Sequence, residues 1–189
     1  MLRRGFKSWC ENTSLAYRKD LDLEKEDPLC PFALSKHLNI QLINPTEVPN
    51  LKNDVLKTLL TDDSESWSAV AISSNNTHLI IYNSSHAKTR QSNDIMHELS
   101  HIIIGHKPQT IHHSPETNLL LRDYDKGQEE EADCFASILL LPKDAVFKIK
   151  FSKIPEVIAA RTYGVSIRLL QMRLNTSGAN HVYQRSRKK

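Results

Sequence analysis

The sequence predicts an α+β fold in which helices predominate and a small antiparallel β-sheet lies next to one central helix. Three observations support this prediction. Residues 94–105 have helical character, and residues 128–141 carry apolar side chains at helical spacing. Two apolar runs, 67–72 and 78–83, are separated by the turn-forming residues 73–77, which is typical of a β-hairpin.

The shorter elements follow from turn residues, prolines and spacing. A proline at the first position of a helix has a favourable backbone angle, so Pro31 is expected to begin one. The remaining expected elements are a helix over 4–20, the Pro31 helix ending near Leu38, a strand over 40–43, and helices over 54–60 and 144–150.

We expect four parts along the chain. They are an N-terminal helical segment over 1–30, a core over 31–150, a helix-turn-helix-like hairpin over 151–178, and a basic tail over 179–189 that is disordered. The 189 residues are enough for one domain with a sizeable core and a small appendage.

Composition indicates a cytoplasmic protein without membrane contact. No apolar run approaches the about 20 residues that a membrane-spanning helix needs. The N-terminus lacks the apolar region of a secretory signal, and the three cysteines form no C-x-x-C pair, so a reducing compartment is expected. The net charge of +3 is too small to predict nucleic-acid binding.

The most informative motif is the run His97-Glu98-Leu99-Ser100-His101, which has the form H-E-x-x-H and falls within the predicted helix at 94–105. On a helix, side chains four residues apart lie on one face, about 5–6 Å apart at Cβ, so the two imidazoles can bind one zinc ion. The Glu98 carboxylate then lies beside the metal, where it can take a proton from water. The motif therefore predicts a zinc-dependent hydrolase, most simply a peptidase.

A third ligand is needed, because a catalytic zinc usually has three protein ligands and one open position. In the helix over 128–141, Glu129 lies nearest to the apolar stripe, whereas Glu130 and Glu131 point away and suit the positive end of the helix dipole. The run of three glutamates leaves Glu130, Glu131 and Asp133 as alternative ligands. Asp133, one turn after Glu129, is expected to accept a hydrogen bond from a ligand histidine.

These residues resemble the ImmA/IrrE family of zinc peptidases. Members combine an H-E-x-G-H helix with a later E-x-x-A-[ND]-x-F-A-x-x-L-L-x-P helix, which is similar to residues 129–142, and the resemblance covers about residues 30–178. Ser100 stands where many members have glycine. The resemblance implies a zincin-like, gluzincin-type fold with these site residues: His97, His101 and Glu129 as ligands of one Zn²⁺ per chain, Glu98 as general base, and Asp133 as the group that orients His97.

The resemblance also implies a function and a partner. Members often cleave a helix–turn–helix repressor of the Xre type, or an antitoxin, encoded on phage or mobile elements, and the cleavage relieves repression. We therefore expect an intracellular endopeptidase with such a protein substrate. Two alternatives remain: a DNA- or partner-binding regulatory module with a zinc site but no proteolysis, and the toxin half of a toxin–antitoxin pair. Intact Glu98 argues against the first, because a structural metal does not need it.

Candidates for substrate contacts come from the segment 106–127, which is expected to be a long loop. A sheet edge beside the metal helix is another candidate, since it can pair with an extended peptide. Spacing favours none of the possible oxyanion donors, which are Arg90, His112, His113, Arg122 and Tyr124.

The C-terminal residues 155–174 predict two helices joined by the turn 162–165, with Ser166 as N-cap of the second. In a DNA-reading helix–turn–helix, Arg168 and Arg173 on the second helix would contact DNA. We favour a helical hairpin packed against the core, because one such unit without a dimerisation segment is a weak signal for DNA.

Overall fold

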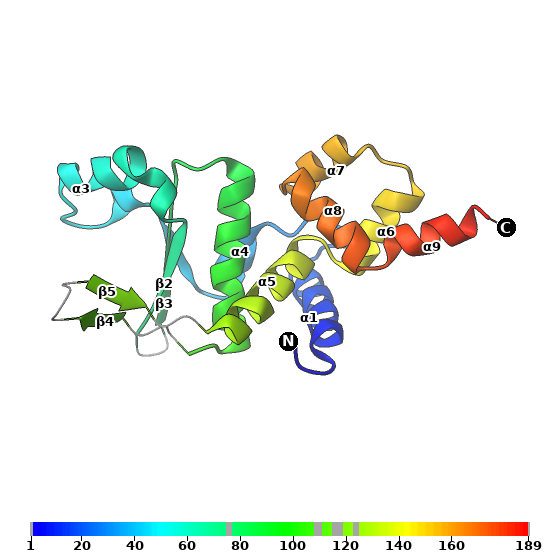
Figure 1. Cartoon of the computed structure of the whole chain (residues 1–189), viewed down its shortest axis with the longest axis horizontal. Coiled ribbons are helices and arrows are strands. Elements are labelled where there is room, and N and C mark those ends of the chain that lie inside the picture. Colours follow the sequence, from blue (N-terminus) through cyan, green and yellow to red (C-terminus); the bar gives the residue numbers. More distant parts are fainter. Residues whose placement is uncertain (1, 75–76, 108–110, 115–118, 123–124, 189) are drawn as a thin grey trace.

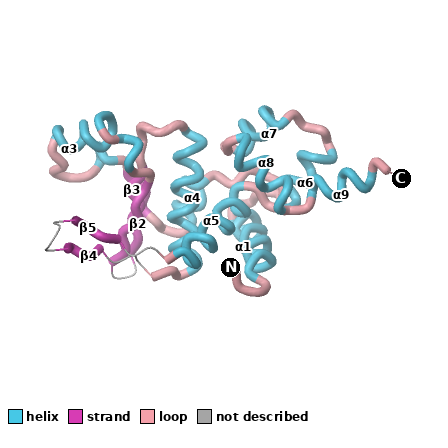
Figure 2. The backbone as a smooth tube through the Cα atoms, viewed as in Figure 1, coloured by secondary structure: helices cyan, strands magenta, loops and turns pink. Residues whose placement is uncertain are grey.

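A computed structural model of the chain describes residues 2–74, 77–107, 111–114, 119–122 and 125–188. Helices make up most of this part of the chain, and a small sheet lies beside the longest helix (Figures 1 and 2). The predicted α+β class is therefore confirmed. The three longest described helices are α1 (Phe6–Asp20), α4 (Lys88–Ile104) and α5 (Lys126–Leu140).

Helix α4 lies at the centre of the fold, with the sheet on one side and α5 on the other, and α1 packs against α5 (Figure 1). The apolar stripe of each helix faces this core. Ile95 and Leu99 of α4 and Phe135 and Leu139 of α5 are completely buried. Burial of such stripes is what stabilises short helices in water.

The sheet contains three strands in the order β1-β3-β2, which are β1 (Gln41–Ile43), β2 (Ala69–Ser74) and β3 (Thr77–Tyr82). Strands β2 and β3 form the predicted antiparallel hairpin, with Ala71 opposite Ile80. The expectation of an antiparallel sheet is wrong for β1, which pairs parallel to β3. Parallel pairing requires a long connection, and the chain between β1 and β3 provides it.

The connection between β1 and β3 contains short helices over residues 44–66, followed by strand β2. Asn44 begins it with a capping box, because its side chain accepts from the backbone of Thr46 while Glu47 accepts from the Asn44 backbone. The short helices are α2 (Pro31–His37) before β1, then η1 (Pro45–Glu47), α3 (Asn53–Lys57), the π-helical turn η2 (Thr58–Asp62) and η3 (Ser64–Ser66).

The C-terminal region is a group of four helices beyond α5 (Figure 1). The tail that was expected to be disordered forms α9, which packs against α6 and α8. Tyr183 explains part of this difference, because its ring contacts Phe151 at 5.5 Å and lies under the Lys150 ammonium at 5.3 Å. The four helices are α6 (Lys143–Phe151), α7 (Glu156–Tyr163), α8 (Ile167–Thr176) and α9 (Ala179–Ser186).

The expected long loop after α4 contains a second, two-stranded sheet. Strands β4 (Ile111–Ser114) and β5 (Leu119–Arg122) pair antiparallel. The loop prediction is therefore wrong for these residues, whose sequences Ile-His-His-Ser and Leu-Leu-Leu-Arg do not alternate and are too short to indicate a strand. In the described part of the chain, no helix combines the length and apolar character needed to cross a membrane.

Candidate metal centre

Three potential metal ligands meet where α4 passes the first turn of α5. His97 and His101 lie one turn apart on α4, and Glu129 lies in the first turn of α5. One ligand atom from each residue can be chosen so that all three atoms lie within 4.8 Å of one another. The side chains are partly buried, with 21%, 16% and 18% of their surface exposed.

The distances within this cluster, which involve both oxygens of Glu129, are close to those around a tetrahedral zinc ion. His97 Nε2 lies 3.0 Å from His101 Nε2 and 3.2 Å from Glu129 Oε2, and His101 Nε2 lies 3.6 Å from Glu129 Oε1. Zinc–ligand bonds of about 2.0–2.2 Å at tetrahedral angles place ligand atoms about 3.3–3.6 Å apart, slightly more than the two shorter distances here. Two imidazoles and one carboxylate are also a donor set that zinc prefers, so the residues fit this metal.

Asp133 lies one turn after Glu129 and contacts the outer nitrogen of His97. Its Oδ1 is 3.0 Å from His97 Nδ1, so it can hold His97 with Nε2 turned toward the cluster. Burial lowers the pKa of His97, but the hydrogen bond with Asp133 and the charges of Asp133, Glu98 and Glu129 outweigh burial and raise it. A metal at this position would therefore compete with a proton for His97.

His101 has the opposite electrostatic environment. Burial, reinforced by the positive charge of His97, lowers the pKa of His101 to about 4. His101 is therefore neutral at pH 7, which is the protonation state that a metal ligand requires.

Glu98 follows His97 on α4 and is partly exposed. Its charge contributes to the raised pKa of His97. Glu98 is not among the three residues that are grouped as potential metal ligands in the described part of the chain, and its role as the general base stays a prediction.

The comparison with protein families agrees with this geometry. The model of the peptidase M78 family, described as the IrrE N-terminal-like domain, matches residues 54–175. The chain belongs to this family. The resemblance predicted from the sequence is thereby confirmed, and membership implies a metallopeptidase. Neither a curated protein nor a solved structure matches the chain.

Within this M78 domain, the structure adds two residues that sequence reasoning missed as parts of the site. His106 Nδ1 lies 2.9 Å from His101 Nδ1, and His106 Nε2 lies 3.3 Å from Glu131 Oε2. Sequence reasoning had explained Glu131 by the helix dipole and kept it as an alternative ligand, not as the partner of a further histidine. The available sequence signal was the histidine five residues after His101, directly behind the helix-ending Gly105.

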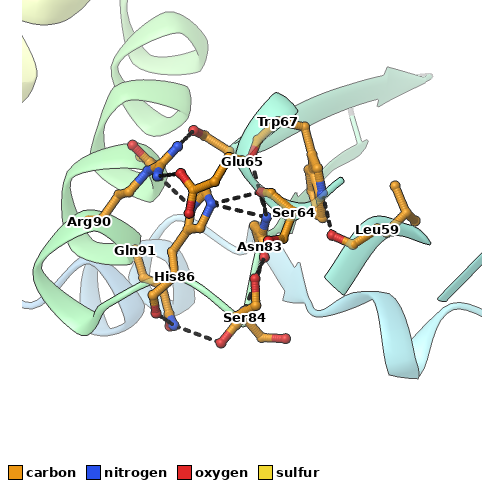
Figure 3. A network of polar contacts seen from close by, with 12 residues as sticks. Leu59, Ser64, Glu65, Trp67, Asn83, Ser84, His86, Arg90 and Gln91 are labelled. Atoms are coloured by element: carbon orange, nitrogen blue, oxygen red, sulfur yellow. Dashed lines mark hydrogen bonds and ion pairs between the residues drawn. The ribbon is translucent and has the colours of Figure 1, made fainter. Parts of the chain in front are cut away.

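Arg90, one of the candidate oxyanion donors, belongs to a different polar network. Figure 3 shows it directed at Glu65 of η3, with which it forms an ion pair. Its guanidinium also lies 3.4 Å from the Ser68 hydroxyl and 3.8 Å from Asp94 Oδ2. The structure therefore does not bring Arg90 into the metal cluster.

The network around Arg90 fixes the start of α4 against the preceding chain (Figure 3). Asn83 donates to the Ser64 carbonyl at 2.8 Å, and His86 Nε2 lies 2.9 Å from the same oxygen. Gln91 donates to the Ser84 carbonyl at 3.0 Å. These contacts hold the helix that carries the metal-site histidines.

The remaining candidate donors lie after α4. His112 lies in β4 with His113, and Arg122 ends β5. Their side chains and all of Tyr124 lie outside the described part of the structure. Their role as substrate contacts stays a prediction.

Proposed function

We propose that this protein is a zinc-dependent endopeptidase that cleaves a protein substrate. The observation that carries this proposal is the cluster of His97, His101 and Glu129, whose ligand atoms lie close to the spacing of a tetrahedral zinc site. Three protein ligands leave one coordination position open, as catalytic zinc sites do. Membership in the M78 family supports a peptidase rather than another hydrolase.

The chain's own residues divide the chemistry between them. A zinc ion bound here supplies Lewis-acid chemistry, which polarises a carbonyl and makes water more acidic. The Glu98 carboxylate accepts a proton from the attacking water and then donates it to the nitrogen of the leaving amine. Asp133 holds His97 in the orientation that points Nε2 to the cluster.

Strand β2 is our proposed docking edge for an extended substrate segment. In the described part of the chain, β2 pairs with β3 alone and lies beside α4. Its outward residues Val70 and Ile72 are 37% and 47% exposed. A peptide that added a strand there would be held by backbone hydrogen bonds next to the metal helix.

The substrate class that we propose is a helix–turn–helix repressor of the Xre type, or an antitoxin. Support for it comes from the family resemblance of the HELSH and E-x-x-x-D helices. On this proposal the peptidase relieves repression by cleaving a regulatory protein.

A metal and activity measurement tests the proposal. Elemental analysis is expected to find one zinc per chain in the wild type and in Glu98→Gln, and none in His97→Ala or Glu129→Ala. Incubation with a peptide library, read by mass spectrometry, is expected to show cleavage by the wild type and at least about 100-fold less by Glu98→Gln.

Three results would contradict the proposal. A wild type that binds no zinc would exclude a metallopeptidase, and equal cleavage by wild type and Glu98→Gln would show that another protein is responsible. A zinc-loaded wild type that cleaves neither the library nor a purified Xre-type repressor would favour the regulatory module without proteolysis.

A further inference from the structure

The two metal-site histidines are held by different groups on their outer nitrogens. Both turn Nε2 toward the cluster, so each Nδ1 carries a hydrogen and needs an acceptor. For His97 the acceptor is the carboxylate of Asp133, whose side chain is 75% exposed. For His101 the contact is another imidazole, His106, whose side chain is only 8% exposed.

A path of contacts runs from His101 through His106 to Glu131. The chemistry of these groups fixes where their hydrogens lie. His101 Nδ1–H donates to His106 Nδ1 at 2.9 Å, which leaves the hydrogen of His106 on Nε2. That group donates to Glu131 Oε2 at 3.3 Å. The other carboxylate oxygen of Glu131, Oε1, forms an ion pair with Arg3 Nε at 3.3 Å. Each of the two imidazole N–H groups therefore meets an acceptor.

The backbone around Gly105 places His106 for this contact. Gly105 has a φ of 77°, the left-handed conformation that glycine adopts without strain, and it ends α4. The next residue turns back, so that the His106 amide donates to the His101 carbonyl at 3.0 Å. The two rings then lie edge to face with their centroids 4.9 Å apart.

Arg3 comes from a part of the chain outside the family match at 54–175. It precedes α1, and its guanidinium lies over the Phe6 ring at 5.0 Å. Phe6 is buried where α1 packs against the core. Through Arg3, the N-terminal segment thereby contacts Glu131, the residue that holds His106.

We propose that His106 and Glu131 are positioning residues for the ligand His101, and that Arg3 ties the N-terminal segment to them. This proposal rests on the proposed function only in requiring that the cluster binds zinc. His106 is not itself placed as a ligand, because it meets the Nδ1 edge of His101, whereas His97 and Glu129 face the Nε2 edge.

The test compares His106→Leu with His106→Asn, because these side chains have nearly the same size and shape. Asparagine Oδ1 can accept from His101 Nδ1–H, and leucine cannot. Zinc affinity, measured by chelator competition on the full chain, is expected to fall about 10–100-fold in His106→Leu and to be largely kept in His106→Asn. The visible absorption spectrum of the cobalt-substituted protein is expected to change only in His106→Leu.

Controls separate this effect from unfolding. Thermal unfolding of the metal-free proteins reports whether each variant is folded, and His181→Asn on α9 removes an exposed imidazole far from the cluster. Equal zinc affinities of the folded Leu and Asn variants would overturn the proposal. A folded His106→Leu that binds no zinc at saturation would also overturn it, since His106 would then be a ligand.

Glu131 and Arg3 are tested by neutral substitutions with matched controls. Glu131→Gln is expected to weaken zinc binding less than His106→Leu, and Arg3→Gln less again, because Arg3 is 60% exposed. Glu24→Gln and Arg4→Gln, which remove the same charges at exposed positions, are expected to match the wild type. Weaker zinc binding in both controls would show that Glu131 and Arg3 act only through their charge, and it would overturn the proposal. A wild type without zinc would instead refute the proposed function.

Discussion

The two ends of α5 use charged groups in opposite ways. At its N-terminal end, Glu129, Glu131 and Asp133 contact imidazoles in a site that water can reach. At its C-terminal end, the carbonyls of Ile138 and Leu139 accept from the buried side chains of Ser14 and Arg18. The first arrangement presents ligand atoms, and the second satisfies backbone groups that the helix leaves without partners.

The C-terminal end is closed by two buried arginines. Arg18 is completely buried and donates to Leu139 O at 2.9 Å and to Asp27 O at 3.0 Å. Burial lowers the pKa of Arg18 to about 10, so it stays charged at neutral pH and suits the negative end of the helix dipole. Arg173 of α8 donates to Leu141 O at 2.8 Å, just past the helix.

This difference teaches that stability and metal binding should be separable along one helix. Groups at the C-terminal end are satisfied within the protein, so their loss should affect unfolding. Groups at the N-terminal end share imidazoles with the expected ion, so their loss should affect affinity. Two substitutions test this separation, and a third tests the N-cap of the same helix, whose carboxylate accepts from backbone amides rather than holding a ligand histidine.

The largest effect is expected for Arg18→Met. The free energy of unfolding should fall by about 3 kcal/mol, because the carbonyls of Leu139 and Asp27 lose their buried donor. Zinc affinity of the folded variant should not change. Urea denaturation checks this, with Lys19→Met at the adjacent exposed position as control. A folded variant that has lost zinc would show that the two ends are coupled.

A smaller effect is expected for Asp133→Ala. Zinc affinity should fall about tenfold, at the weak end of the usual range, because this carboxylate is 75% exposed and water can replace it. The unfolding midpoint of the metal-free protein should not decrease. Chelator competition measures the affinity, and Asp20→Ala at the exposed end of α1 is the control. Unchanged zinc affinity would mean that Asp133 does not orient His97.

The smallest effect concerns Asp125, the N-cap of α5. Its carboxylate accepts from Gln128 and from the Gly127 amide, and these bonds lower its pKa. A folded pKa below the unfolded one gives stability that is present above the unfolded pKa and is lost as pH falls through the folded one. Asp125→Ala should therefore lower the thermal midpoint at pH 7.

The difference in thermal midpoint between Asp125→Ala and the wild type should become smaller as the pH falls below the usual pKa range of a carboxyl group. Asp125→Asn, which keeps an oxygen acceptor for the cap, should unfold closer to the wild type. Thermal melts across this pH range make the comparison. A deficit of Asp125→Ala that is independent of pH would show that the ionised cap is not its cause.

Sequence reasoning located helices α1 to α8 and the cluster because each depends on local spacing. Four-residue spacing places His97 beside His101, and the apolar stripe of α5 fixes the face on which Glu129 lies. Such arguments describe one helix at a time. They could not find His106, which follows the end of α4, or the contact of Glu131, which points away from the stripe of its own helix.

Sequence reasoning also could not predict contacts between segments that lie far apart in the sequence. Arg173 lies in a helix–turn–helix pattern that is common to DNA-binding proteins and to packed helical hairpins. The structure shows that it is buried and donates to the Leu141 carbonyl. The direction of β1 in the sheet likewise depends on the route of the chain through residues 44–68, which no local pattern specifies.

Helix α1 runs beside α5 over most of its length. Arg3, just before α1, meets Glu131, the Trp9 ring lies 5.0 Å from that of Phe135, and Arg18 meets Leu139. The stretch that defines the family begins at residue 54, yet its metal-bearing helix is completed by residues that precede this boundary. The segment that the family model matches is therefore shorter than the segment whose residues pack around α5.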